Sequence, residues 1–323
     1  MNSKVKTPNI LWENILSDSL DINNINIDSF REIGADNNRF CTWDAIEPTS
    51  RYFKSLLYAY AENLDSRILQ SKLSLDLKSD NKKNGDGIRH YLKNIRNLNL
   101  GNPLTINYFG NDISIDYLLS TEEMFFLDEV LKESKTVLEI GAGFGRLAHS
   151  IIENFENIER YIIVDLDLVL TLSKLYLSKV LNKKEFLKIK FISNNDLAAI
   201  QSLEPEGGDI SINVDSFQEI EESIVFDYLE LISENSNYFY TKNPICKYHP
   251  NSVNIKLKNK VQFESAINMG LCKDIIDIFD SNAIQKARDI YLRKYCPKKF
   301  KISKHESCFG QYLYYYSALY KCK

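Results

Sequence analysis

Three glycines that alternate with other residues follow a short apolar run, and an acidic residue stands just before them. The segment reads Thr-Val-Leu-Glu-Ile-Gly-Ala-Gly-Phe-Gly-Arg-Leu-Ala over residues 136–148. A buried strand that ends in a tight glycine turn and then enters a helix lets a ligand come very close to the backbone. The spacing therefore predicts a ligand-binding turn at this point of the chain.

The spacing also favours one class of ligand. Dinucleotide-binding turns have the pattern Gly-x-Gly-x-x-Gly, but Arg146 stands where that pattern has its third glycine. The carboxylate of Glu139, two residues before Gly141, suits a sulfonium cofactor with a free amino group better than it suits a pyrophosphate. An NAD-dependent oxidoreductase is therefore disfavoured.

This Glu-x-Gly-x-Gly-x-Gly arrangement resembles the first motif of class I S-adenosylmethionine-dependent methyltransferases. The resemblance implies that the turn cradles the amino-acid end of S-adenosyl-L-methionine and that Glu139 helps to orient it. The turn residues that it implies are Gly141, Ala142, Gly143, Phe144 and Gly145. The alternative is a glycine turn that serves only the packing of helix against strand.

Two further polar positions follow apolar runs. Asp165 ends the run that begins at Tyr161, and a carboxylate there is placed to accept hydrogen bonds from ribose hydroxyls. We predict that Asp165 and the adjacent Leu166 contact the cofactor. In the resembled family the next loop often meets the adenine ring, which implies that Asn195 or Asp196 pairs with its exocyclic amine. The alternative for Asp196 is a plain helix cap.

Candidates for the chemical step come after the fourth and fifth apolar runs. Ligands of open α/β sheets bind beyond the carboxyl ends of the strands, which places Asp215 at the mouth of the cleft. Glu219 shares a helix face with Asp215 if a helix begins near Ser216. His249 could take a proton from an acceptor hydroxyl, because imidazole titrates near neutral pH. The two carboxylates could hold a divalent metal ion, but no metal site is predicted. The alternatives are a helix cap at Asp215, a solvated carboxylate at Glu219 and an exposed loop histidine.

The elements that must position these residues alternate along the chain. Expected strands are Thr136–Ile140, Arg160–Asp165, Lys188–Ile192, Ile210–Val214 and Tyr238–Lys242. Expected helices between them are Arg146–Phe155, Val169–Lys179 and Phe217–Glu234. Such alternation predicts an α/β fold with a doubly wound, Rossmann-like and mostly parallel sheet. After a helix at Ala283–Tyr295, strands at Phe300–His305 and Tyr312–Cys322 predict an antiparallel pair at the C-terminal edge.

The part of the chain that precedes these alternating strands and helices has a different sequence pattern. We expect residues 1–120 to form a helical N-terminal region that covers the cleft and supplies acceptor contacts, and residues 121–323 to form the methyltransferase domain. Apolar spacing predicts helices within Asp44–Leu64 and around His90–Leu98. A third helix is expected at Leu118–Glu133, with Ser120 or Thr121 as its N-cap.

Over roughly residues 108–248 the chain is similar to bacterial sugar O-methyltransferases. The similarity rests on segments 109–114, 139–148, 161–173, 213–219 and 240–247. It implies transfer of a methyl group from S-adenosyl-L-methionine to a hydroxyl of a sugar that is capsular, part of lipopolysaccharide or nucleotide-activated. Asp215-Ser-Phe departs from the Asp/Asn-Pro-Pro-Tyr signature of many enzymes that methylate amino groups of nucleic acid. Two alternatives stay open: N-methylation of an amino sugar or small metabolite, and a non-catalytic methyltransferase-like binding module.

The composition of the chain limits its expected partners and its expected location in the cell. The 323 residues carry a formal net charge of −4 without a basic stripe, which disfavours nucleic acid as a partner. No apolar run is long enough for a membrane span, and the polar start of the chain does not look like a signal peptide. Six scattered cysteines without a Cys-x-x-Cys pair favour reduced thiols and a cytoplasmic location. The expected partner is a small-molecule or sugar acceptor, and a homodimer is possible.

Overall fold

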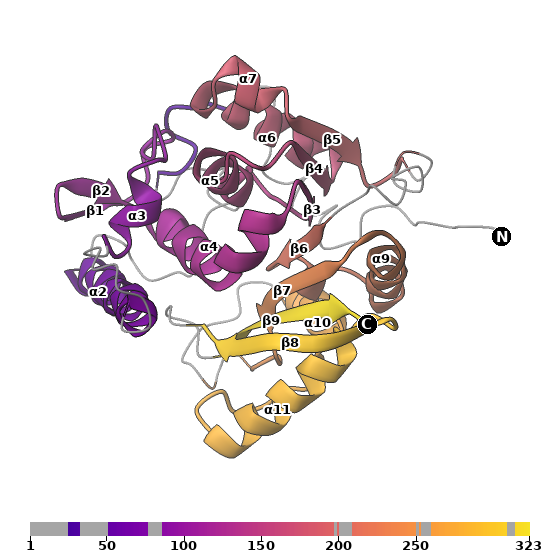
Figure 1. The fold of residues 1–323 in the computed structure, drawn as a ribbon. Coiled ribbons are helices and arrows are strands. Elements are labelled where there is room, and N and C mark those ends of the chain that lie inside the picture. The colour runs from indigo at the N-terminus through magenta and orange to yellow at the C-terminus, as the bar shows by residue number, and fades with distance from the viewer. Residues whose placement is uncertain are drawn as a thin grey trace.

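The computed structural model describes residues 25–32, 51–76, 86–196, 199, 209–249, 252, 260–308 and 314–323. Cys41 and the first part of the helix predicted within Asp44–Leu64 lie outside these ranges. The elements before the main sheet are α2 (Arg51–Asp76), α3 (Arg89–Leu92), β1 (Ile106–Tyr108), β2 (Asn111–Ile113) and α4 (Ile115–Glu133). The main part, shown in Figure 1, contains β3 (Thr136–Ile140), α5 (Arg146–Asn154), β4 (Arg160–Asp165), α6 (Asp167–Val180), α7 (Lys183–Phe186), β5 (Ile189–Ser193), β6 (Ile210–Val214), the 3-10 turn η3 (Phe217–Glu219), α9 (Glu222–Asn235), β7 (Tyr238–Pro244), α10 (Lys260–Asn268), α11 (Ser281–Lys294), β8 (Phe300–Ser307) and β9 (Tyr315–Cys322).

The main sheet has seven strands in the order β5-β4-β3-β6-β7-β9-β8. Strands β3 to β7 pair in parallel, whereas β9 runs antiparallel to both of its neighbours, β7 and β8. The strand order reverses between β3 and β6, and such a switch point is where open α/β sheets bind ligands beyond the carboxyl ends of their strands. The predicted fold class is confirmed: a doubly wound, mostly parallel sheet with an antiparallel pair at its C-terminal edge.

Helices cover both faces of the sheet (Figure 1). Along β3, Val137 packs into the core that includes side chains of α4, α5 and α6. Leu138 and Ile140 of the same strand pack into the core on the other face of the sheet, with side chains of α9 and α11. Side chains alternate between the faces of a strand, so a strand that is buried on both sides carries apolar residues at successive positions.

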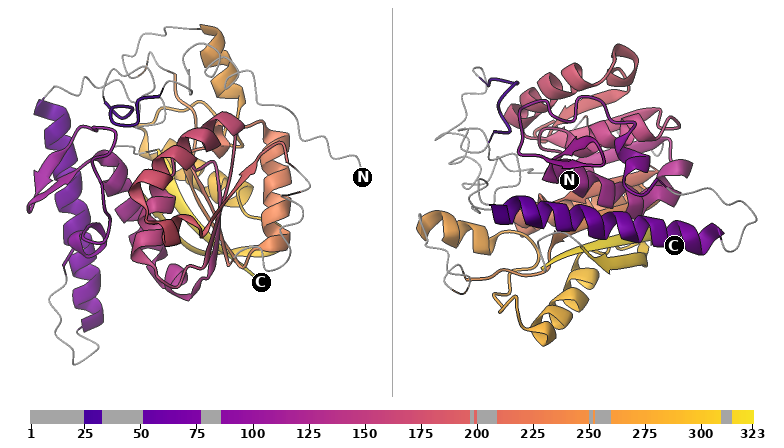
Figure 2. Two further views of the ribbon diagram at one scale, coloured as in Figure 1. Left: turned by 90° about the horizontal axis from the view of Figure 1, so that it is seen from above. Right: turned by 90° about the vertical axis from the view of Figure 1, so that its left-hand side faces the viewer.

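The N-terminal elements continue one of these cores. Leu57, Tyr60 and Leu64 of α2 belong to the same buried cluster as the side chains of α4 and α5. Figure 2 shows α2 along the outside of the molecule, beside α4. Helix α4 runs through residues 120 and 121, where we expected the N-terminal region to give way to the main domain. The division into two parts, with the first as a cover of the cleft, stays a prediction.

A buried arginine ties the segment 25–32 to α4 and to the loop that contains Leu98 and Leu100. The Arg31 guanidinium donates to Asp116 Oδ2 at 2.6 Å and to the Leu98 and Leu100 carbonyls at 3.0 Å each. It also lies 5.4 Å from the ring centroid of Phe144, inside the glycine turn. A guanidinium with this many acceptors can be buried without an unpaired charge.

The start of α4 differs from the prediction. The helix begins at Ile115, so Ser120 and Thr121 lie inside it, where their hydroxyls donate to backbone carbonyls four residues earlier. The N-cap is Ser114, whose side-chain oxygen accepts a hydrogen bond from Arg31 instead of capping the helix. A contact from 83 residues away therefore replaces the local capping pattern.

The prediction of a helix over Phe217–Glu234 is also wrong, at the start of that helix. One 3-10 turn, η3, is followed by the extended residue Ile220, and α9 begins only at Glu222. The carbonyl of Ile220 accepts a hydrogen bond from the Gly270 N–H at 2.8 Å. This long-range bond takes the carbonyl that a continuous helix would use, so Glu219 does not share a helix face with Asp215.

Candidate functional site

The three glycines after β3 have different neighbours. All have positive φ, at +77° for Gly141, +57° for Gly143 and +95° for Gly145. A Cβ on Gly141 would lie 2.1 Å from Ser216 Oγ, and one on Gly145 would lie 2.7 Å from Leu177 Cδ1. Among the described residues, chain neighbours aside, a Cβ on Gly143 would meet no atom within 4 Å. Packing explains the first and third glycines, whereas the second leaves backbone facing open space, as close approach by a ligand requires.

Asp165 lies directly beside this open position. Its Oδ2 accepts the Gly143 N–H at 3.0 Å, and its Oδ1 accepts the Leu166 N–H at 2.8 Å. Burial raises the pKa of Asp165 to about 7, although these backbone hydrogen bonds act to lower it. Each carboxylate oxygen has two lone pairs, so both can accept a further hydrogen bond from a ligand hydroxyl.

Glu139 and Phe144 face the interior of the molecule. Glu139 is 3% exposed and accepts a hydrogen bond from the Tyr161 hydroxyl at 2.7 Å. Burial raises the pKa of Glu139 to about 7, against the effects of Tyr161 and of the Arg146 charge. Phe144 is also 3% exposed, with its ring edge-on to Tyr176. Both side chains pack in the interior of the molecule, and their direct contact with a cofactor stays a prediction.

Asn195 and Asp196 follow β5, next to the end of β4. Both side chains are exposed. Asp196 Oδ1 accepts the backbone N–H of Ala199 at 3.0 Å, which is the geometry of a helix N-cap. Because Asp165 is paired in register with Ser193, this turn is adjacent to the expected ribose position. Contact with an adenine ring stays a prediction.

Asp215 lies at the end of β6 in an unusual conformation. Its φ is +57°, a left-handed value that aspartate adopts more readily than most residues. Its N–H donates to the Lys242 carbonyl at 2.9 Å. The Tyr315 hydroxyl donates to its Oδ1 at 2.6 Å, and the Gln218 amide donates to the same oxygen. Burial raises the pKa of Asp215 to about 6, although the Tyr315 hydrogen bond and the Lys242 charge lower it.

The other two candidates for the chemical step have different surroundings. Glu219 lies in η3, and its charge acts on Lys247, whose Nζ donates to the Gln218 carbonyl at 3.1 Å. Burial lowers the pKa of Lys247, against the effect of Glu219. His249 is exposed, and its ring lies 5.5 Å from that of Phe263 in α10. The structure thus gives Asp215 a set of polar partners and gives His249 an aromatic one.

Three buried charged side chains lie behind the site together with the half-buried Arg146, and we call the four the buried charge cluster: Glu122, Glu123, Arg146 and Lys242. Lys242 Nζ lies 2.8 Å from Glu122 Oε2 and 3.1 Å from Glu123 Oε1. Arg146 Nη1 lies 2.8 Å from Glu123 Oε2. The Tyr60 hydroxyl of α2 donates to Glu122 at 2.9 Å. Two cations thus balance two carboxylates, as burial demands.

The buried charge cluster connects the two parts of the site. Arg146 is the first residue of α5, directly after Gly145, and the Lys242 backbone holds Asp215. Although burial raises the pKa of Glu123, the Arg146 and Lys242 charges lower it below its ordinary value. Sequence reasoning missed the cluster and Tyr315, because their partners lie far away along the chain. It also missed Gln218, whose partner Asp215 is three residues away, because it predicted a continuous helix at this turn. Lysine in the middle of the apolar strand β7 was the one local signal.

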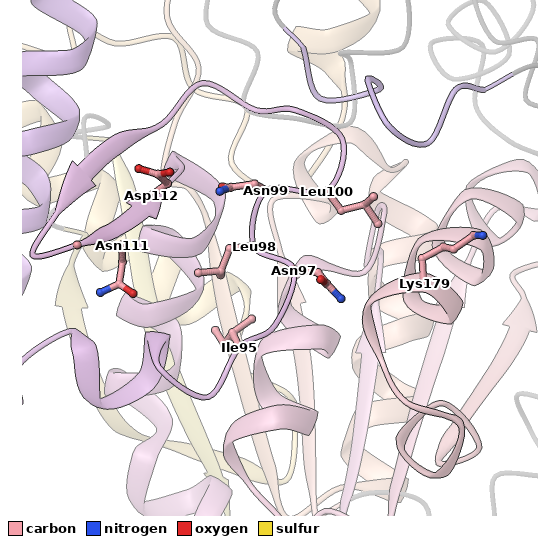
Figure 3. A pocket seen from close by; sticks show the side chains of 9 residues that line it. Ile95, Asn97, Leu98, Asn99, Leu100, Asn111, Asp112 and Lys179 are labelled. Carbon is pink, nitrogen blue, oxygen red and sulfur yellow. The ribbon is translucent and has the colours of Figure 1, made fainter.

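A cavity of about 550 Å³ lies elsewhere (Figure 3). It is lined by Ile95, Asn97, Leu98, Asn99, Leu100, Gly110, Asn111, Asp112 and Lys179. Lys179 and Asp112 lie at opposite ends of it, and its side chains do not converge on one point (Figure 3). Among the described residues, no group of three or more His, Cys, Asp or Glu side chains is arranged to hold a metal ion. No described helix combines the length and apolarity that crossing a membrane requires.

No protein-family model matches the sequence, and no curated protein matches it. Solved structures give distant likenesses. The methyltransferase domain of bacterial CtHen1 is 13% identical with a TM-score of 0.43, over 63% of this chain and 96% of that one. Mitomycin 7-O-methyltransferase MmcR is 10% identical with a TM-score of 0.38, over 64% of this chain and 57% of that one. Human N-acetylserotonin methyltransferase in complex with SAM is 12% identical with a TM-score of 0.37, over 64% of this chain and 54% of that one.

Proposed function

We propose that this chain binds S-adenosyl-L-methionine at the carboxyl edge of its sheet and transfers the methyl group to a hydroxyl of a sugar. The observation that carries the proposal is the turn at Gly143. Its backbone has a left-handed conformation, faces open space and lies beside the Asp165 carboxylate at the switch point of the sheet.

The residues present fit this cofactor. The Gly143 backbone would lie against its amino-acid end, and Asp165 would accept hydrogen bonds from the ribose hydroxyls. Asn195 and Asp196 are exposed beside Asp165 and would border the adenine ring. Bound S-adenosyl-L-methionine supplies an electrophilic methyl group on a sulfonium centre. The chain therefore has two tasks: to align the acceptor and to take its proton.

We assign proton removal to Asp215. A hydroxyl is a poor nucleophile until its proton leaves, so transfer to oxygen needs a base near the acceptor. Asp215 lies at the end of β6, next to the turn, and a carboxyl with a pKa of about 6 is largely ionised at neutral pH. The acceptor proton would pass to its carboxylate, and the lone pair left on the acceptor oxygen would form the bond to the methyl carbon. The methyl–sulfur bond would break with its electron pair going to sulfur, which leaves S-adenosylhomocysteine. Glu219 and His249 remain the alternative bases.

The sugar acceptor, in capsular, lipopolysaccharide or nucleotide-activated form, is supported by the sequence resemblance over residues 108–248. N-methylation of an amino sugar is the second candidate. An amine needs no strong base, so that reaction would not depend on Asp215.

The test is release of S-adenosylhomocysteine over a panel of nucleotide sugars, with and without magnesium and chelator. Asp215→Asn keeps the size and the left-handed preference of the residue and removes its basicity. We expect it to lower turnover by roughly a hundredfold or more and to leave cofactor affinity unchanged. His249→Ala, the comparison variant, should turn over normally. Full activity of Asp215→Asn together with loss in His249→Ala would assign the base to His249. No product with any acceptor would contradict the proposed function.

A further inference from the structure

The carboxylate of Asp215 is held on one side. Among the described residues, both hydrogen bonds to it go to Oδ1, one from the Tyr315 hydroxyl at 2.6 Å and one from the Gln218 amide. The same Gln218 amide lies 3.3 Å from the Tyr315 hydroxyl. Gln218 is three residues away in the same turn, whereas Tyr315 comes from 100 residues further along the chain.

The backbone around Tyr315 is fixed by its neighbours. It begins β9 and is paired in register with Pro244 at the end of β7. The Tyr314 carbonyl accepts the Ile245 N–H at 2.9 Å, and the Tyr315 carbonyl accepts the Cys308 N–H at 3.5 Å. The C-terminal hairpin therefore brings one hydroxyl to a defined place at the end of β6.

We propose that Tyr315 is the positioning residue for Asp215: its hydroxyl fixes Oδ1, so that Oδ2 is the oxygen that takes the proton of the acceptor hydroxyl. The proposal rests on the proposed function, in which Asp215 is the base. A carboxylate held through one oxygen keeps its orientation while the other oxygen stays available, and such preorganisation raises the fraction of productive encounters.

Several charged groups act on Asp215 besides Tyr315. Lys242 of β7 and Arg146 of α5 favour its ionised form, and Glu123 of α4 disfavours it. Lys247, after β7, also interacts electrostatically with Asp215. The Tyr315 hydrogen bond, which favours the ionised form, is the one that a single-atom change can remove.

The first experiment titrates the Asp215 carboxyl itself in the full chain. Aspartate labelled with ¹³C at the carboxyl is followed by NMR against pH, and Asp215→Asn identifies the signal. Tyr315→Phe should raise the titration midpoint, because the hydrogen bond favours the ionised carboxylate. The matched control is Tyr316→Phe, on the same strand, whose hydroxyl lies 2.8 Å from His305 Nδ1 and is not bonded to Asp215. An unchanged midpoint in Tyr315→Phe would overturn the proposal.

The second experiment is the pH dependence of turnover, provided that the wild type forms S-adenosylhomocysteine. In Tyr315→Phe, the midpoint of the pH profile of turnover should rise with the NMR midpoint, which costs about tenfold in turnover below it for each unit of the rise. Loss of orientation should also lower the alkaline plateau, with KM unchanged. A merely structural defect would lower turnover equally at every pH, and that result also counts against the proposal. If the wild type forms no product, the proposed function fails, but the titration still decides whether Tyr315 holds Asp215.

Discussion

The glycine turn and the surroundings of Asp215 lie at the same edge of the sheet, but they are held by different forces. The turn is fixed by backbone conformation and by close packing, since Gly141 and Gly145 leave no room for a Cβ. Asp215 is fixed by hydrogen bonds and charges that come from β7 and β9. The first region should therefore respond to added bulk, and the second should respond to a change of charge.

The largest effect is expected from a substitution in the buried charge cluster, which adjoins Asp215 through Lys242. Lys242→Met removes the cation that lies against Glu122 and Glu123, and Arg146 contacts only the second of these carboxylates among the described ion pairs. Removal of one partner from a buried ion pair typically lowers the free energy of unfolding by about 3–5 kcal/mol. Urea denaturation measures the loss. The double variant Lys242→Met/Glu122→Gln leaves one balanced pair and should recover part of it. A loss below about 1 kcal/mol would mean that charge does not hold this region.

Glu139 shows whether charge also matters in the first region. Its folded-state pKa of about 7 lies above the ordinary value, so the folded state binds more protons than the unfolded state between about pH 4 and pH 7. The unfolding free energy should therefore fall as pH rises through this window. Glu139→Gln, which can still accept the Tyr161 hydrogen bond, should remove that fall and gain up to about 3 kcal/mol at pH 8 over the wild type. The difference should vanish near pH 4. Urea denaturation at both pH values is the measurement, and an equal difference at both would contradict the burial account.

A smaller difference in the free energy of unfolding is expected between substitutions of Gly141 and Gly143. Gly141→Ala combines a left-handed conformation with a clash against Ser216 and should lower the unfolding free energy by about 3 kcal/mol. Gly143→Ala carries the conformational penalty alone, about 1 kcal/mol, because among the described residues an added Cβ would clash with no side chain or backbone beyond its chain neighbours. Its main effect should be on cofactor affinity, measured by calorimetry. Equal destabilisation by the two substitutions, with cofactor affinity intact in Gly143→Ala, would indicate a turn that serves packing only.

The difference between local and long-range contacts explains which elements could be predicted from the sequence. The strands Thr136–Ile140, Arg160–Asp165 and Ile210–Val214 have the predicted bounds, because apolar runs bounded by a glycine or an acid are local signals. The glycine turn is local in the same sense. The N-cap of α4 and the start of the helix expected over Phe217–Glu234 were predicted wrongly, because Arg31 and Gly270 take the groups that the local pattern would use.

The residues that hold Asp215 could not be predicted for a similar reason. Tyr315 lies in a hairpin 100 residues away, and nothing in its immediate sequence indicates a polar partner. Nothing in the sequence around Glu122 and Glu123 indicates that Lys242, about 120 residues away, lies beside them. Contacts made across the sheet depend on strand order, which spacing along the chain does not encode.

Calorimetric titration of the full chain with S-adenosylhomocysteine and, separately, with NAD tests most directly which cofactor the glycine turn binds. We expect saturable binding of S-adenosylhomocysteine and none of NAD. Asp165→Ala should weaken the binding by about tenfold or more, through loss of hydrogen bonds to the ribose. Asp167→Ala, at the exposed first residue of α6, should leave it unchanged. Binding of NAD in preference, or S-adenosylhomocysteine affinity that is indifferent to Asp165, would contradict the assignment of the glycine turn.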